Sequence, residues 1–387
     1  MSRNIWILSL VSLFTDMASE MLYPIMPVYL KSIGFSIVFI GVLEGVAEAV
    51  AGLSKGYFGR RSDLMGRRLP FVQIGYGLSA LSKPMLALWA HPLWVFFART
   101  TDRLGKGVRT GARDALLSDE ATAATKGRVF GFHRSMDTLG AVMGPLLALL
   151  FLYLHPGAYR SLFLLAFIPG LLAVVCTLLV RESGNTARRT MSNKPRFLDF
   201  FRYWQQSPAQ YRRLVGALLL FAVFNSSDVF LLLKIKEAGC SDSMVIGIYI
   251  FYNLVYALFA YPIGILADRI GMKKVFSFGL LLFAAVYAGM AFAETTLAFF
   301  GLFALYGVYA AATEGVAKAW ISNISAKEDT ATAIGTFTAF QSLAALLASS
   351  LAGGIWYWKG SGVTFLLSAG VALAVGIYVM RPRNTYF

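Results

Sequence analysis

The sequence is short of charge, cysteine and histidine, and each shortage excludes a class of protein. Only 14% of the 387 residues are charged, whereas a soluble domain of ordinary composition has about 25%. Two cysteines, Cys176 and Cys240, are too few for a disulfide framework. Neither they nor the three histidines have the spacing of a zinc, haem or iron-sulfur site. We therefore expect no metal site and no bound cofactor.

The sequence is rich in hydrophobic residues. They make up 57% of the chain, and apolar runs of about 20 residues, the length of a membrane-spanning helix, recur along it. We expect an all-α membrane protein with the lipid bilayer as its surroundings. Its transmembrane helices, about twelve in number, are predicted at 5–30, 37–58, 69–91, 92–118, 129–154, 160–180, 214–238, 243–266, 274–293, 298–323, 331–357 and 361–380. Since Asp16 and Glu20 interrupt the first run, it is interpreted as an uncleaved helix and not as a signal peptide.

The basic residues predict the topology. The formal net charge is +15, and Lys and Arg gather after the second and eighth predicted helices, in the central segment 181–213 and at the C-terminus. By the positive-inside rule, both termini and the central segment are cytoplasmic. Within that segment, residues 197–204 predict a short amphipathic helix along the membrane surface. No basic tail with interleaved aromatic residues is present, so nucleic acid is not an expected partner.

The two halves of the sequence repeat. Gly59, Asp63 and Gly66 recur as Gly264, Asp268 and Gly271, and the same spacing carries Lys31, Gly34 and Ser36 onto Lys236, Gly239 and Ser241. The chain is therefore predicted to be a duplicated six-helix unit, with bundles at 1–180 and 214–387 joined by a basic linker at 181–213. Internal duplication around a site near the membrane midplane is typical of secondary transporters.

The repeated residues resemble the major facilitator superfamily over the whole chain. Its loop signature is G-x-x-x-D-[RK]-x-G-[RK]-[RK]. The first copy matches it at Gly59, Asp63, Gly66, Arg67 and Arg68, with Leu64 where a basic residue is usual, and the second at Gly264, Asp268, Arg269, Gly271 and Lys273. Gly140 and Gly144-Pro145 resemble the G-x-x-x-G-P signature of exporters and antiporters. The charged fourth helix and residues 225–234 resemble a prokaryotic subgroup whose substrates are mostly unassigned. The resemblance implies a monomeric, alternating-access transporter of a bacterial inner membrane.

The resemblance also implies that the loop signature forms a gate on the cytoplasmic side. Charged residues near that loop are added to the set of candidate gating residues. The residues assigned to gating are Gly59, Asp63, Gly66, Arg67, Arg68, Arg113, Asp114, Arg134, Asp137, Gly140, Gly144, Pro145, Gly264, Asp268, Arg269 and Gly271.

The fourth predicted helix carries a charged face. At about 100° per residue, Arg99, Arg103, Lys106 and Arg113 fall in one stripe. Charge facing lipid is costly, so this face is expected to line a polar path. The candidate substrate-binding residues are Tyr23, Arg99, Arg103, Lys106, Arg109, Asn225, Asp228, Tyr252, Tyr256, Glu314 and Lys318. Glu314 and Lys318, one turn apart, could also satisfy each other.

Carboxylates in the first half are candidates for proton coupling. They are Asp16, Glu20, Glu44, Glu48 and Asp102, and each must be paired, protonated or hydrated to lie inside a membrane. Acidic and basic residues are equally numerous in the membrane part of this half, so mutual pairing with a purely structural role is an open alternative. Lys83, followed by Pro84, is expected to extend its ammonium group out of the span or to mark a kink.

These observations favour proton-coupled export, by antiport, of a small charged or zwitterionic organic molecule. Two alternatives stay open: a proton-coupled importer or facilitator of an organic anion, and a divalent-metal exporter that uses the carboxylates as oxygen ligands. An enzyme is not expected, because the Gly105-Lys106-Gly107 triplet lacks the spacing of a phosphate-binding loop. Without a nucleotide site, the energy is expected to come from the proton gradient.

Overall fold

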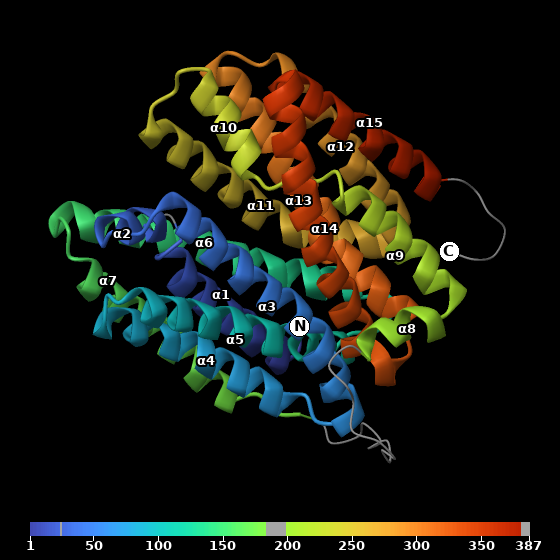
Figure 1. The fold of residues 1–387 in the computed structure, drawn as a ribbon. Coiled ribbons are helices and arrows are strands. Elements are labelled where there is room, and N and C mark those ends of the chain that lie inside the picture. The colour runs from blue at the N-terminus through green and yellow to red at the C-terminus, as the bar shows by residue number, and fades with distance from the viewer. Residues whose placement is uncertain (24, 183–198, 381–387) are drawn as a thin grey trace. The chain divides into compact units, whose positions relative to one another are not determined.

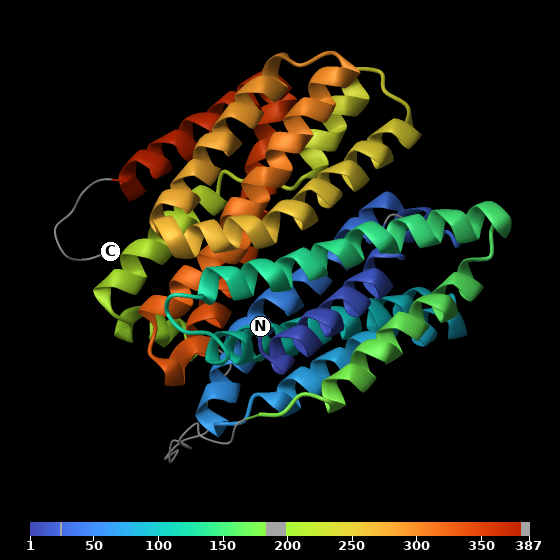
Figure 2. The ribbon, with the colours of Figure 1, turned by 180° about the vertical axis from the view of Figure 1, so that it is seen from behind.

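The chain is almost entirely helical. The computed structural model describes residues 1–23, 25–182 and 199–380, and this described part contains no strand (Figures 1 and 2). The helices are α1 (Arg3–Glu20), α2 (Met26–Ser32), α3 (Ile37–Met65), α4 (Leu69–Leu88), α5 (Pro92–Asp119), α6 (Lys126–Leu154), α7 (Tyr159–Leu178), α8 (Phe200–Gln206), α9 (Ala209–Ala222), α10 (Val229–Glu237), α11 (Asp242–Ile270), α12 (Met272–Phe292), α13 (Thr296–Ile324), η1 (Lys327–Asp329), α14 (Thr330–Lys359) and α15 (Ser361–Met380).

Every predicted span corresponds to one or two of these helices. Within the described residues, seven helices are long and apolar enough by themselves to cross a membrane: α6, α7 and α11 to α15. The first predicted span appears as α1 and α2, and the seventh as α9 and α10. The predicted all-α architecture is confirmed, with two of its spans interrupted.

The two interruptions fall at corresponding positions of the repeat. The helix predicted at 5–30 stops at Glu20 and resumes at Met26, and the one predicted at 214–238 is unwound over 223–228. The prediction of unbroken helices was wrong at both places. In the second break, Asn225, Ser226 and Asp228 bring short polar side chains, which compete with the helix for backbone hydrogen bonds.

The chain divides into two compact units. Unit 1 contains Met1–Glu120, Met136–Gln206 and Ala326–Ala339, and unit 2 contains Ala121–Ser135, Ser207–Ser325 and Phe340–Phe387. The beginning of α6 is thus grouped with the second half of the sequence, and the beginning of α14 with the first. The two helices that are shared in this way occupy equivalent places in the repeat.

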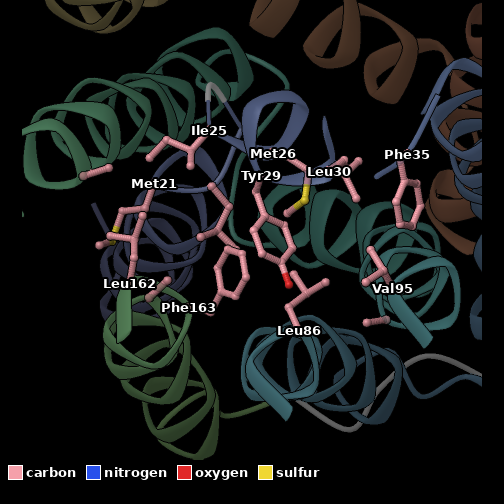
Figure 3. Close-up of a cluster of buried hydrophobic side chains, with 14 of the residues drawn as sticks. Met21, Ile25, Met26, Tyr29, Leu30, Phe35, Leu86, Val95, Leu162 and Phe163 are labelled. Atoms are coloured by element: carbon pink, nitrogen blue, oxygen red, sulfur yellow. The ribbon is translucent and has the colours of Figure 1, made fainter. Parts of the chain in front are cut away.

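Unit 1 is built around α5. This helix packs against α3 and α4, while α7 packs against α4 and α1. A hydrophobic cluster fixes α2 after the break, and in Figure 3 the ring of Tyr29 lies between Leu86 and Phe163. The rings of Tyr29 and Phe163 meet edge to face, with centroids 4.9 Å apart. Since lipid is as apolar as these side chains, close packing is the main contribution of the cluster to stability.

Unit 2 repeats this design with α13 packed against α11 and α12, and with α12 against α15. The repeat is visible in the backbone as well. The glycines with positive φ in the described residues form three pairs, each with one member in either half: Gly34 with Gly239, Gly66 with Gly271 and Gly157 with Gly360. Glycine adopts this conformation without steric cost, which explains why the repeated turns use it.

The linker helix α8 docks on unit 1. Its Phe200 is 1% exposed, and a β-carbon built at Gly56 of α3 would lie 2.6 Å from the Phe200 ring. Arg60 donates a hydrogen bond to the carbonyl oxygen of Asp199 at 2.7 Å. A helix lies in the segment where the amphipathic helix was predicted, and its Phe200 and Tyr203 are buried. Its location along a membrane surface stays a prediction. Residues 197 and 198 of that prediction lie outside the described residues.

Candidate transport sites

The charged face of α5 begins with a buried ion pair. Lys83 of α4 is 2% exposed, and its ammonium group lies 2.7 Å from the Asp102 carboxylate and 3.2 Å from the Ser19 hydroxyl of α1. The expectation that Lys83 reaches out of its span was wrong, because a carboxylate on the neighbouring helix satisfies its charge. Asp102, a candidate for proton coupling, is engaged in this pair.

Arg109, further along α5, is buried against two side chains of α4. Arg109 is 5% exposed, donates to the Ser79 hydroxyl at 2.5 Å and lies 4.5 Å from the centroid of the Tyr76 ring. Cation–π attraction to Tyr76 and the hydrogen bond to Ser79 stabilise the buried guanidinium, although its Nε has no hydrogen-bond partner in the described residues.

Arg113 connects three helices of unit 1. Its guanidinium donates to the adjacent Asp114 at 2.8 and 2.9 Å and to Ser12 of α1 at 3.3 Å. Ser12 in turn donates to Asp137 of α6. This chain of contacts links three of the predicted gating residues, and it runs through a serine that no charge pattern could have indicated.

Arg103 and Lys106 of α5 lie near carboxylates of α1 and α3. Arg103 lies 3.7 Å from Glu48 of α3, whose side chain is 50% exposed. Lys106 is exposed, and it acts electrostatically on both Asp16 and Glu20. One carboxylate oxygen of Glu20 is buried and has no hydrogen-bond partner in the described part of the chain. This group of charges is able to accept a proton or a polar ligand.

Three further candidates of unit 1 are placed as follows. Arg99 is buried, and Tyr23 is 47% exposed beside the break between α1 and α2. The side chain of Glu44 lies outside the described residues. In the part of the chain that the structure describes, no cluster of three or more His, Cys, Asp or Glu residues could hold a metal ion.

In unit 2, the break between α9 and α10 faces stacked tyrosines. The Tyr306 hydroxyl donates to the Asp228 carboxylate at 2.6 Å, and the Asn225 amide donates to the Tyr309 hydroxyl at 3.2 Å. Tyr252 stacks on Tyr306, with ring centroids 5.0 Å apart. The structure therefore brings together Asn225, Asp228 and Tyr252, three of the predicted substrate-binding residues. Tyr256, one turn along α11, is 6% exposed.

Glu314 of α13 forms an ion pair with Arg134 of α6. Its side chain is 43% exposed, and that of Arg134 is 24% exposed. A predicted substrate-binding residue and a predicted gating residue are thus partners. Lys318 is half-buried, one turn further along α13.

The first loop signature caps the beginning of α14. Asp63 accepts hydrogen bonds from the backbone amide and the hydroxyl group of Thr332, at 2.6 and 2.8 Å. Arg68 donates to Asp63 at 3.0 Å, to the Lys327 carbonyl oxygen at 3.0 Å, and to Asp119. A carboxylate at the start of a helix satisfies free amide groups and the positive end of the helix dipole.

Both charged groups of this cap lie beyond the predicted span 37–58. Burial raises the pKa of the Asp63 carboxyl to about 6, although Arg68 and the hydrogen bonds from Thr332 act in the opposite direction. Burial alone would lower the pKa of the Arg68 guanidinium, but the carboxylates of Asp63 and Asp119 raise it above its ordinary value. Arg67, the neighbouring gating candidate, is exposed.

The second loop signature caps α6 in the same way. Asp268 accepts hydrogen bonds from the backbone amides of Gly127 and Arg128, at 2.7 and 2.8 Å. Arg269 is exposed, and Gly271 ends α11 with a φ of 98°. The two signatures are therefore structurally equivalent.

Glycines allow the capped helices to approach closely. A β-carbon at Gly59 would lie 2.5 Å from the Ala331 carbonyl oxygen, and one at Gly264 would lie 3.1 Å from the Gly131 α-carbon. Gly144 similarly meets the Met17 carbonyl oxygen of α1 at 2.7 Å, and Gly140 also packs against α1. Pro145 lies inside α6 without ending it.

Comparison with known proteins finds relatives with similar sequences and structures with a similar fold. The model of the Major Facilitator Superfamily matches residues 8–252 and 214–385. The chain belongs to the major facilitator superfamily. It is 33% identical to an uncharacterised MFS-type transporter of Methanocaldococcus jannaschii over 392 residues, which cover 98% of this chain and 95% of the relative. This member of the superfamily is therefore a secondary transporter in a membrane, and not an enzyme.

Two more distant similarities extend the comparison. The multidrug resistance protein MdtG of Serratia proteamaculans is 23% identical to this chain over 324 residues, which cover 76% of this chain and 72% of the relative. The crystal structure of the human organic anion transporter MFSD10 superposes with a TM-score of 0.84 and 16% identity, covering 98% of this chain and 99% of the other. At that identity, the structure supports the fold alone.

Several residues that contact the candidate sites were not predicted from the sequence. Lys83 was visible as a cation inside a span, and a search for an acidic partner on the next helix would have found Asp102. Tyr306 and Tyr309 lie on one face of α13 at helical spacing, a pattern that also describes ordinary core aromatics. Thr332 gave no signal, since its role depends on the position of Asp63 in space.

Proposed function

We propose that this transporter exports a small charged or zwitterionic organic molecule in exchange for protons. The observation that carries the proposal is the group formed by Asp16, Glu20, Glu48, Arg103 and Lys106. It combines carboxylates that can take up protons with cations that can hold the acidic end of a cargo, inside helices expected to cross the membrane. A buried Glu20 oxygen that has no hydrogen-bond partner among the described residues supports a proton-binding role.

Export is supported by the small residues of α6 that pack against α1, because Gly140, Gly144 and Pro145 match a signature of exporters. The name of the MdtG relative, a multidrug resistance protein, agrees with this direction. The mechanism would be alternating access of the bundles 1–180 and 214–387, with Asp63 and Asp268 in the gates. We further propose a monomer in a prokaryotic inner membrane, with both termini in the cytoplasm.

The proposal is tested with purified protein in proteoliposomes. A thermal-shift screen of organic ions first identifies a cargo, and a pH-sensitive dye inside the vesicles then reports proton movement during cargo flux. Proton movement opposite to the cargo indicates antiport, and movement in the same direction favours the importer. Glu20→Gln, Glu48→Gln and Arg103→Ala should change the pH dependence, whereas Glu294→Gln, at an exposed loop position, should not. If all three variants transport with unchanged pH dependence, the coupling assignment is wrong.

A further inference from the structure

The break between α9 and α10 presents a carboxylate that is not paired with a cation in the part of the chain that the structure describes. Asp228 stands at the start of α10, but its side chain makes no capping hydrogen bond to that helix. The carboxylate accepts instead from the Tyr306 hydroxyl at 2.6 Å. It forms no ion pair with any residue that the structure describes.

The charge that acts on Asp228 is that of Glu314, which is also negative. Glu314 has its own cation, because it is paired with Arg134. The two carboxylates of this region are therefore unequal: within the described residues, Glu314 has a cationic partner and Asp228 has none. A half-buried carboxylate without a cation is costly inside a membrane protein. A positive charge from outside the chain would compensate it.

The surroundings of Asp228 favour an organic cation. Tyr252, Tyr306 and Tyr309 form a stack, with centroids 5.0 Å apart in the first pair and 5.2 Å in the second. All three are less than 10% exposed. The electron-rich faces of aromatic rings attract cations and disfavour anions.

A neutral acceptor lies in the same break. The amide nitrogen of Asn225 donates to Tyr309, while its oxygen is buried and has no hydrogen-bond partner in the described residues. A proton on Asp228 would neutralise the carboxylate but would leave this amide oxygen unsatisfied. A group with several N–H donors can satisfy both oxygens, as an ammonium group does.

We propose that Asp228, Asn225 and the Tyr252–Tyr306–Tyr309 stack bind the ammonium group of an amine cargo. The ammonium group donates to the carboxylate and to the Asn225 oxygen, and the tyrosine rings hold the carbon atoms next to it. This inference rests on the proposed transport function and narrows its substrate class to cationic or zwitterionic amines.

The test uses three compounds with one carbon skeleton and different charge. Thermal unfolding of the detergent-purified full-length protein is followed with phenethylammonium, 2-phenylethanol and phenylacetate. We expect concentration-dependent stabilisation by phenethylammonium only. Asp228→Asn, which keeps the size of the side chain, should weaken this effect at least about tenfold in apparent affinity. Glu294→Gln serves as a matched control in the same unit.

A second pair of variants tests the rings. Tyr252→Phe keeps the aromatic face and should retain most of the affinity, whereas Tyr252→Leu should lower it by roughly threefold to tenfold. Equal stabilisation by the amine and the alcohol, no stabilisation by the amine, or an unaffected Asp228→Asn protein would each overturn the inference. These binding results are independent of the vesicle experiment: amine binding without proton exchange refutes the coupling alone, and proton exchange without amine binding refutes this site alone.

Discussion

The two aspartate caps allow a paired test of the gate, since each holds the start of a different helix. One oxygen of Asp63 accepts both hydrogen bonds from Thr332, and the other accepts from Arg68. Replacing Asp63 by Asn removes the negative charge that strengthens all three bonds and leaves one acceptor oxygen for the two sets of donors. A hydrogen bond to a charged group contributes about 1.5–3 kcal/mol, and one between neutral groups about 1 kcal/mol. We therefore expect the start of α14 to lose about 2 kcal/mol of protection against opening.

Hydrogen exchange measures this loss directly. At pH 7.5 the Asp63 carboxyl, with its pKa of about 6, is ionised in the native protein. A loss of about 2 kcal/mol corresponds to roughly thirtyfold faster exchange of amides at the start of α14, including that of Thr332. The peptide covering 326–339 should show the change by mass spectrometry, and the peptide covering 121–135 should not.

The equivalent variant is the control. Asp268→Asn should accelerate exchange in 121–135, where one of the Gly127 and Arg128 amides loses its acceptor oxygen and both lose a charged partner, and leave 326–339 unchanged. Equal acceleration of both peptides by either variant would refute the idea that each aspartate acts on its own helix. Unchanged exchange at Thr332 in Asp63→Asn would refute the capping role itself.

Two further predictions concern buried contacts. Lys83→Met leaves Asp102 buried without a cation and should destabilise the protein by about 3–5 kcal/mol in thermal unfolding, with partial recovery when Asp102→Asn is added; full stability of the single variant would contradict the pairing. Gly264→Ala places a β-carbon against the Gly127 carbonyl oxygen and the Gly131 α-carbon and should cost about 1–3 kcal/mol. Gly247→Ala in the same helix meets no atom within 4 Å and should be neutral or stabilising, so similar losses in both glycine variants would argue against the close crossing.

The sequence was sufficient to predict the number and approximate positions of the spans, because apolar length and loop charge follow from local composition. The duplication was predictable as well, since Gly59, Asp63 and Gly66 recur in register. The breaks after Glu20 and after Ala222 were missed, because both lie inside runs that are long and apolar enough to pass for one helix. At the second break, the cluster from Asn225 to Asp228 was interpreted as a substrate site and not also as a helix breaker.

Pairing between helices was the least predictable feature. The charged stripe of α5 was predicted from helical spacing, yet the partners of its residues depend on which helices lie beside that stripe. Ser12 became visible as a partner of Arg113 only in three dimensions. The docking of Phe200 was hidden for the same reason, since the gap that it fills exists because Gly56 has no side chain.

The two aspartate caps also carry information about the origin of the chain. Asp63 in the first repeat binds the helix start of the second repeat, and Asp268 in the second binds the helix start of the first. If a six-helix ancestor existed as a separate protein, one aspartate and one helix start would have met twice across a two-fold axis between identical subunits. Such an isologous contact closes on itself and needs only one gene to evolve. Fusion of the two copies would then have freed each contact to diverge, which accounts for a threonine hydroxyl at one cap and a second backbone amide at the other.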